Sequence, residues 1–251
     1  MLNIVDTLIR DTSHGNQIDE HLFIREQGQL DPQLRRHVRS DAVLAGRLFD
    51  IAHLDRLNTD YGFWDNTTLS MKQPLVEYVR DGASVLEVGP GPAATLSLYL
   101  YRHKQGLEIV CAEIHPPFLE SARQAVALNQ AAIRLIHSDM TAQVPGRFDV
   151  IFMTPPYLDA ARLQELGIRL GSSEAQAGNG GADGSDVTAK VLRDVPSSLA
   201  SGGVALLGIN NGYLEDARVV QLINDAGVRL LRRYYRTDQM PPYSQVYVVQ
   251  A

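Results

Sequence analysis

Apolar residues recur at two different spacings along this chain, with a change near residue 76. Before that point they return at roughly helical spacing with charged residues between them, at Leu8, Ile9, Leu22, Phe23, Leu34, Val38, Ala42, Leu48 and Phe49. This spacing is typical of amphipathic helices. Asp31-Pro32 indicates a helix start, because aspartate caps helix N-termini and proline suits the first helical position. We expect residues 1–75 to form a small helical N-terminal region that acts as a lid or binds substrate.

From residue 76 to residue 251, short apolar runs alternate with helical stretches. Strands are expected at 84–88, 108–113, 133–137, 150–153 and 204–209, and helices at 94–104, 117–129 and 187–199. This alternation is typical of an α/β fold with a parallel sheet covered on both faces. Two β-rich runs at the end, 228–235 and 244–249, indicate an antiparallel pair that closes the sheet.

Residues 171–186 are rich in glycine, serine, alanine and acidic side chains, and lack the large apolar residues that a core needs. A long polar loop inside a domain often serves as a lid or a binding loop. We expect such a loop here, with Asp183 and Asp186 capping a turn and the following helix.

The composition is ordinary for a globular enzyme, with 45% apolar and 21% charged residues. The net charge of −6 argues against broad nucleic-acid binding, which usually needs a basic face. Arg35, Arg36 and Arg39 form a local basic run that either contacts an anionic partner or is a solvated face. Cys111 is the sole cysteine, and no window approaches the ~20 apolar residues of a membrane span. We expect a cytoplasmic protein without a metal site.

The most informative motif is Thr154-Pro155-Pro156-Tyr157, which follows the apolar run 148–153. Neither proline continues a helix or a central strand, because each lacks an N–H and fixes its own φ. The chain therefore stops at the carboxyl end of a buried strand, where open α/β sheets place their ligands. Tyr157 offers a flat ring there and Thr154 a carbonyl and a hydroxyl, which suits the holding of a nitrogen atom in one orientation.

A second motif is a glycine turn between strand 84–88 and the next helix. Its residues are Glu87, Gly89, Pro90, Gly91, Pro92 and Ala94. The two glycines and the alanine match the dinucleotide fingerprint, so a nicotinamide or flavin cofactor is one interpretation. The prolines count against it, because each removes a backbone N–H that a pyrophosphate would bind. S-adenosylmethionine carries no phosphate, and Glu87 could balance its positive groups.

Acidic residues also close the next two strands. Glu113 ends the strand 108–113, where a carboxylate can accept hydrogen bonds from both hydroxyls of a ribose. Asp139 follows the strand 133–137, where it could accept the adenine amino group while the Met140 backbone meets the ring edge. Together these positions indicate a cofactor site along the ends of neighbouring strands.

This series of motifs resembles the class I S-adenosylmethionine-dependent methyltransferases, and most closely the HemK/PrmC-type glutamine methyltransferases and the small methyltransferase domain. The resemblance covers roughly residues 60–251, and its matching positions are Glu87, Gly89, Gly91, Glu113, Asp139, 154–157, 181–186 and 201–207. It implies a Rossmann-like sheet of seven strands, mostly parallel, with a C-terminal antiparallel hairpin. It also implies S-adenosyl-L-methionine as the cofactor.

The resemblance assigns roles to further residues. It places Thr68, Ile114 and Met140 at the cofactor, and Phe63, Trp64 and Pro156 at the substrate. For the two aromatic residues the alternative is a hydrophobic joint between the N-terminal helices and the core. Two positions depart from the family, since Ala93 replaces a turn glycine and Thr154 replaces the asparagine of an Asn-Pro-Pro-Tyr motif.

These features predict methyl transfer to a nitrogen of a small-molecule amine or amide, or of a protein side chain. The carbonyls of Thr154 and Pro155 would accept the hydrogens of the acceptor nitrogen and aim its lone pair, while Tyr157 stacks on the acceptor plane. Three alternatives stay open: an NAD-dependent oxidoreductase, a cofactor-binding regulator without catalysis, and a nucleic-acid acceptor, which the acidic charge disfavours.

Overall fold

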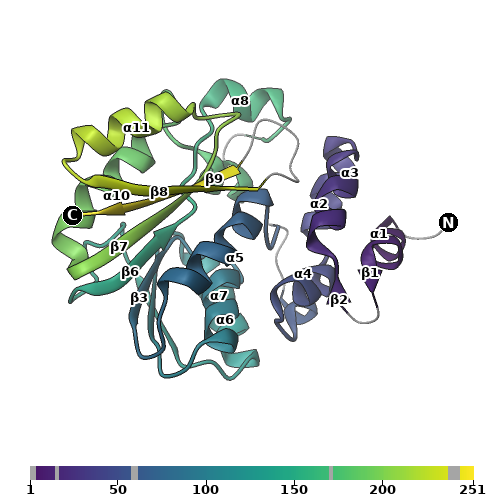
Figure 1. Cartoon of the computed structure of the whole chain (residues 1–251). Coiled ribbons are helices and arrows are strands. Elements are labelled where there is room, and N and C mark those ends of the chain that lie inside the picture. The colour runs from purple at the N-terminus through teal and green to yellow at the C-terminus, as the bar shows by residue number, and fades with distance from the viewer. Residues whose placement is uncertain (1–3, 15–16, 58–61, 170–171, 237–243) are drawn as a thin grey trace.

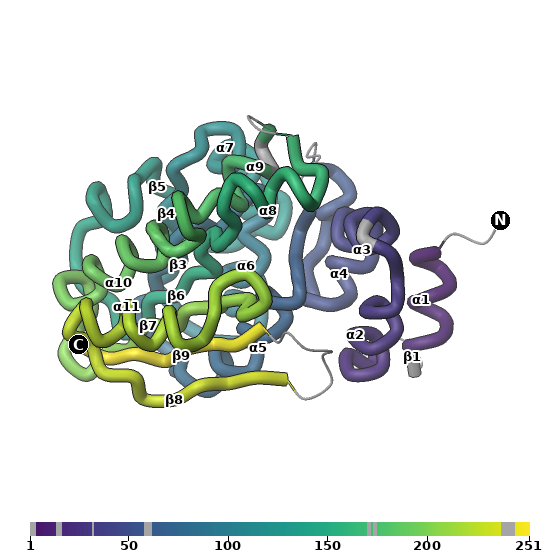
Figure 2. Tube along the Cα trace, turned by 90° about the horizontal axis from the view of Figure 1, so that it is seen from above, coloured from purple at the N-terminus to yellow at the C-terminus, as the bar shows by residue number. Residues whose placement is uncertain are grey.

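The computed structural model describes residues 4–14, 17–57, 62–169, 172–236 and 244–251. Its main sheet has seven strands in the order β5-β4-β3-β6-β7-β9-β8 (Figures 1 and 2). Their bounds are β3 Ser84–Val88, β4 Glu108–Glu113, β5 Ile133–His137, β6 Phe148–Met153, β7 Leu199–Asn210, β8 Arg229–Tyr235 and β9 Ser244–Gln250. The first five of these strands are parallel, and β9 pairs antiparallel with β7 and β8. The predicted fold class is confirmed.

Successive side chains of a strand point to opposite faces of the sheet. Apolar clusters bury both of these faces. In β3, Val85 belongs to one apolar cluster and Leu86 to the other. The first cluster includes residues of α5 (Asn66–Tyr78), α6 (Thr95–His103) and α7 (Pro116–Leu128). The second includes residues of α10 (Asp186–Ser198) and α11 (Asp216–Asp225), so helices cover each face as predicted.

The N-terminal region is mainly helical, as expected, and lies at one side of the sheet (Figure 1). It contains α1 Ile4–Thr12, β1 Ser13–His14, β2 Gln17–Ile18, α2 Glu20–Gly28, α3 Pro32–Arg39, α4 Ala42–Phe49 and the 3-10 helix η1 Leu54–Arg56. Asp19, Asp31 and Asp41 cap α2, α3 and α4 through their side chains. Helix α5 spans the boundary expected at residue 75 and packs against β7 and β9.

The segment expected to be one long polar loop is partly helical. Helix α9 (Ser173–Gly178) follows α8 (Ala160–Glu165). Ala175 packs in a small apolar cluster with Leu158, Leu163 and Ile168, so the expectation of one long loop without core residues was wrong. The reason is a tertiary contact, because Ala175 packs on three larger apolar side chains from the preceding segment.

None of the helices within the described ranges has the length and apolar content that a membrane crossing requires.

Gly208 of β7 allows α5 to approach the sheet closely. A Cβ at this position would lie 2.8 Å from Thr67 Cγ2, 3.0 Å from Thr154 Cγ2 and 3.1 Å from Met71 Sδ. We predict that Gly208→Ala lowers the free energy of unfolding by about 1–3 kcal/mol, because these side chains must shift. Urea unfolding measures this. Gly28→Ala is the control, since nothing lies within 4 Å of that Cβ; equal effects of the two substitutions would contradict the prediction.

Candidate functional site

The candidate site lies at the carboxyl ends of β3, β4 and β6. The chain runs from β3 to β4 and β5 on one side and then returns to β6 on the other side of β3. This reversal is a topological switch point, where open α/β sheets bind ligands. The glycine turn (residues 89–94) leaves β3 there and the Thr-Pro-Pro-Tyr motif (residues 154–157) leaves β6, so the fold brings the two predicted motifs together.

The glycine turn has a left-handed backbone at three positions. Gly89 has a φ of 68°, Gly91 a φ of 65° and Ala94 a φ of 47°. The two glycines adopt such angles without strain, whereas Ala94 does so as the N-cap of α6. Ala93 is not among the residues of positive φ, so an alanine is tolerated where the family has a glycine.

Glu113 supports this turn from the end of β4. Its Oε2 accepts the Gly91 N–H at 3.3 Å, and its Oε1 accepts the His115 N–H at 2.8 Å. The side chain is buried, and burial raises its pKa. The next residue, Ile114, is 47% exposed. The structure thus places the acid of Glu113 at the turn and an exposed apolar side chain next to it in the chain.

Glu87 is buried behind the turn. Its Oε2 accepts hydrogen bonds from the Ser97 N–H at 3.2 Å and the Ser97 hydroxyl at 2.5 Å, and the thiol of Cys111 lies 3.9 Å from it. Burial raises the pKa of Glu87 to about 7 despite these bonds. Glu87 thus belongs to a hydrogen-bond network within the protein, and with a pKa of about 7 it gains or loses its proton near neutral pH.

Asp139 and Met140 lie in the turn after β5. Asp139 is exposed and forms an ion pair with Lys190 through one carboxylate oxygen. Met140 has a left-handed φ of 53°, and its carbonyl accepts the Ser138 hydroxyl at 2.8 Å. Asp139 and Met140 thus follow β5, whose last residue, His137, pairs with Glu113 at the end of β4.

Tyr157 joins three parts of the chain through its hydroxyl. It donates to Asp65 Oδ2 at 3.1 Å and lies 3.3 Å from Thr67 Oγ1, which in turn lies 3.1 Å from Ser244 Oγ. Asp65 is the N-cap of α5 and forms a capping box with Thr68. Burial, followed by the nearby Asp65 carboxylate, raises the pKa of Tyr157 well above its usual value, so the phenol stays neutral.

The structure gives Thr68 a helix-capping contact. Its hydroxyl donates to Asp65 Oδ1 at 3.0 Å and accepts the Asp65 N–H at 3.1 Å. Phe63 and Trp64 are buried, at 7% and 4% exposure, and Trp64 packs on Phe23 of α2 with ring centroids 5.6 Å apart. These aromatics form the hydrophobic joint that sequence reasoning held as an alternative.

Pro155 is buried and the other motif residues are part-buried. The Thr154 hydroxyl makes no hydrogen bond to any part of the chain that the structure describes, while the Thr154 methyl faces Gly208. Residues 180 and 184 lie directly behind the motif. A Cβ on Gly180 would lie 2.7 Å from the carbonyl oxygen of Pro156, and a Cβ on Gly184 would lie 2.4 Å from the carbonyl oxygen of Tyr157. Two glycines therefore allow residues 178–186 to pack directly on the motif backbone.

Sequence reasoning missed Asp65, Thr67 and Tyr213. The Tyr213 ring, 37% exposed in the turn after β7, stacks on Tyr157 with centroids 5.8 Å apart and planes 9° apart. No local motif marks Tyr213, whereas Asp65 could have been recognised as a helix cap from Asp65-x-x-Thr68.

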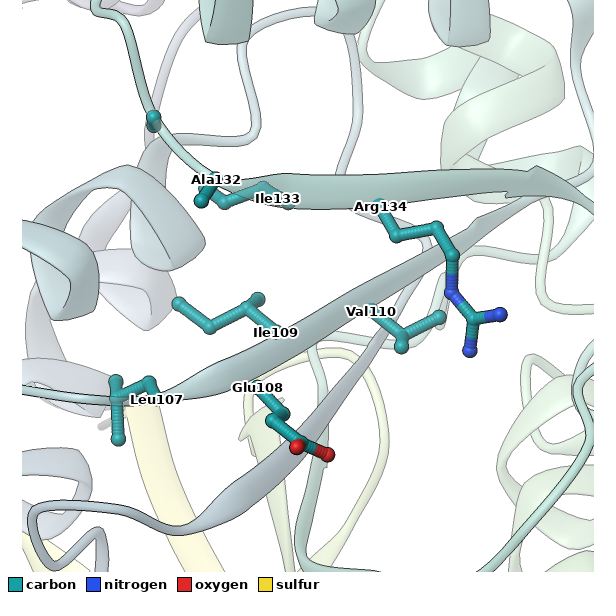
Figure 3. A pocket seen from close by; sticks show the side chains of 8 residues that line it. Leu107, Glu108, Ile109, Val110, Ala132, Ile133 and Arg134 are labelled. Atoms are coloured by element: carbon teal, nitrogen blue, oxygen red, sulfur yellow. The ribbon is translucent and has the colours of Figure 1, made fainter.

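Two cavities lie away from this site. One of about 740 Å³ lies between the N-terminal region and helices α5 and α6, with Glu20, Lys72 and Tyr99 among its lining residues. Another of about 520 Å³ lies at the starts of β4 and β5 and is lined by Glu108 and Arg134, among others (Figure 3). The second is at the opposite end of the strands from Glu113. No group of metal-binding side chains is found among the residues described.

Comparison with known proteins confirms the resemblance. Residues 65–169 match the family model of the Methyltransferase small domain. The release factor glutamine methyltransferase of Cereibacter sphaeroides is 31% identical over 150 residues, which are 58% of this chain and 52% of that protein. The ribosomal protein uL3 glutamine methyltransferase of Neisseria meningitidis is 30% identical over 149 residues, 58% of this chain and 49% of that protein. The chain thus spans about half the length of these curated relatives.

Solved structures agree on the fold. The crystal structure of a methyltransferase from Pyrococcus furiosus superposes with a TM-score of 0.59 at 20% identity, covering 88% of this chain and 98% of that one. The ribosomal protein L11 methylase of Lactobacillus delbrueckii subsp. bulgaricus has a TM-score of 0.56 at 16% identity, covering 77% of this chain and 83% of that one.

The buried Glu87 predicts a pH-dependent stability. Because its folded pKa of about 7 exceeds the ordinary value of 4.5, the folded state binds more protons than the unfolded state between these values. Its contribution to stability is therefore lost as pH rises through this window, by about 3 kcal/mol at about 1.4 kcal/mol per unit. Urea unfolding of wild type and Glu87→Gln from pH 4 to pH 8 should show the variant gaining stability relative to wild type. Parallel profiles would contradict this.

Proposed function

We propose that this chain is an S-adenosyl-L-methionine-dependent methyltransferase that methylates a nitrogen of a protein side chain. The observation that carries the proposal is the juxtaposition, at one switch point, of an acid-lined glycine turn and the Thr-Pro-Pro-Tyr motif. The glutamine methyltransferase names of its relatives favour a side-chain amide as acceptor. The free, buried Cys111 is compatible with a reducing compartment, and we place the enzyme in the cytoplasm.

The residues present fit this cofactor better than a dinucleotide. Glu113 is buried against the turn and bonds its Gly91 N–H, so an acidic group stands where a dinucleotide would put its pyrophosphate. Glu87 adds a second buried acid behind the turn. Pro90 and Pro92 remove two N–H donors from the same turn. S-adenosylmethionine carries a sulfonium and an ammonium, which an acidic turn attracts, and its ribose would meet Glu113. When bound it supplies an activated methyl group.

The cofactor-binding residues in this proposal are the glycines of the turn, Glu113 with Ile114, and Asp139 with Met140. Glu113 accepts hydrogen bonds from hydroxyls, while Ile114 offers an exposed apolar surface for a flat ring. Thr68 acts indirectly, because it fixes Asp65. Glu87 lies behind the glycine turn, where the protonation state of its carboxyl determines the local charge.

The Thr-Pro-Pro-Tyr motif positions the acceptor. Because two prolines stiffen the segment and residues 178–186 pack behind it, the carbonyls of Thr154 and Pro155 are held in fixed directions, with Pro156 bordering the acceptor. They would accept the hydrogens of the acceptor nitrogen and aim its lone pair, and such fixed geometry supplies much of an enzyme's acceleration. Tyr157 is a neutral phenol bonded to Asp65, so its ring orients the acceptor rather than taking its proton. Tyr213 stacks on one face of that ring and helps to fix its orientation.

We predict that S-adenosylhomocysteine binds the chain and that Glu113→Gln weakens binding by about tenfold or more, since hydrogen bonds to charged groups contribute about 1.5–3 kcal/mol. Titration calorimetry measures this. Glu108→Gln is the matched control, because Glu108 is exposed at the other end of the same strand. Conversion of S-adenosylmethionine to S-adenosylhomocysteine with glutamine-containing peptides tests turnover.

Three outcomes would overturn the proposal. Tight NAD binding without S-adenosylhomocysteine binding would indicate an oxidoreductase. Cofactor binding without turnover on any amide or amine acceptor would indicate a regulator. Equal affinity of the Glu113 and Glu108 variants would place the ligand elsewhere.

A further inference from the structure

Helix α3 carries three arginines on one side. Arg35, Arg36 and Arg39 have the spacing i, i+1 and i+4, which places them together on a helix surface, whereas Val38 is fully buried. Within the described ranges no ion pair joins any of the three to an acidic side chain. We call these residues the α3 arginine face. It is a local basic surface on a chain of net charge −6.

This face adjoins the Thr-Pro-Pro-Tyr motif. Arg36 Nη1 donates to the carbonyl of Leu166 at 3.4 Å, which joins α3 to the segment that follows the motif. The carbonyl of Arg39 accepts the Phe63 N–H at 3.0 Å. Phe63 precedes Asp65 by two residues, and Asp65 accepts the hydrogen bond of the Tyr157 hydroxyl. In Figure 2 the N-terminal helices and the α8–α9 segment accordingly lie next to each other.

Arg39 is the innermost residue of the α3 arginine face. Its Nε is buried and has no hydrogen-bond partner among the residues that the structure describes. The positive charge of Arg39 lowers the pKa of Tyr157, whereas burial of the phenol raises it. The terminal nitrogens of Arg39 form no hydrogen bond with the described residues and are not among the buried, unpaired atoms, so a bound oxyanion would meet them in the planar geometry that arginine favours.

We propose that the α3 arginine face binds carboxylates of the methyl acceptor, and that the acceptor is an acidic polypeptide segment that reaches the motif past Arg39. This rests on the proposed function for the role of the motif. Three arginines suit a short segment with a few carboxylates. A nucleic acid, with a charge every ~1.7 Å of duplex, would need a longer basic surface and would be repelled by the acidic remainder of the chain.

The test uses fluorescein-labelled peptides of equal length with a central glutamine, flanked by aspartates, by asparagines or by lysines. Fluorescence anisotropy measures their binding to the full chain, and S-adenosylhomocysteine formation measures turnover. We expect the aspartate peptide to bind best and Arg39→Gln to weaken it by about tenfold, as for a lost charged hydrogen bond. Arg193→Gln, an exposed arginine on α10, is the matched control and should leave binding unchanged.

The outcomes separate this proposal from the proposed function. Equal binding of all three peptides, or equal effects of Arg39→Gln and Arg193→Gln, would overturn the acidic-segment proposal even if turnover occurs. Arg39-dependent binding of the aspartate peptide without turnover would support it while contradicting the methyltransferase activity. Arg39-dependent binding of a single-stranded RNA oligonucleotide, with no aspartate-peptide binding, would also overturn it. Unchanged S-adenosylhomocysteine affinity and urea unfolding of Arg39→Gln would show that the variant is folded.

Discussion

The hydrogen bond from the Tyr157 hydroxyl to the Asp65 carboxylate is the contact on which the arrangement of the site depends. Asp65 caps α5 with one carboxylate oxygen and receives Tyr157 with the other. Thr67 extends the network to Ser244 at the start of β9. The end of β6, the start of α5 and the antiparallel end of the sheet are therefore fixed relative to one another by partly or fully buried polar contacts. Such contacts are costly when one partner is removed, because the other is left buried and unsatisfied.

The glycine turn and the Thr-Pro-Pro-Tyr motif have different physical requirements. At the turn, Glu87 and Glu113 are buried acids, and Pro90 and Pro92 leave few N–H donors. At the motif, stiffness matters, and the chain obtains it from two prolines in front and from glycines at 180 and 184 behind. An acidic turn next to a stiff segment suits the proposed pair of a cationic methyl donor and an acceptor that must be oriented.

Much of this could be predicted from the sequence. Strands 84–88 and 108–113 are short runs with mainly apolar residues, the first followed by Gly89 and the second ending in Glu113, and the structure has them at the predicted residues. Helix α11 was not predicted, although Val219, Leu222 and Ile223 have the i, i+3 and i+4 spacing of an amphipathic helix. Tyr213 stacks on Tyr157 although the two residues are 56 positions apart in the chain. Tyr157 donates its hydrogen bond to Asp65 across 92 positions. No local pattern indicates such pairs, because the fold alone brings them together.

The most direct test of the account is a double-mutant cycle on Tyr157 and Asp65, with methyl transfer to a glutamine-containing peptide as the readout. Tyr157→Phe and Asp65→Asn should each lower kcat while S-adenosylhomocysteine affinity stays unchanged, and the double variant should be little slower than either single variant, because both substitutions break one contact. Fully additive losses would contradict the claim that this hydrogen bond positions the acceptor.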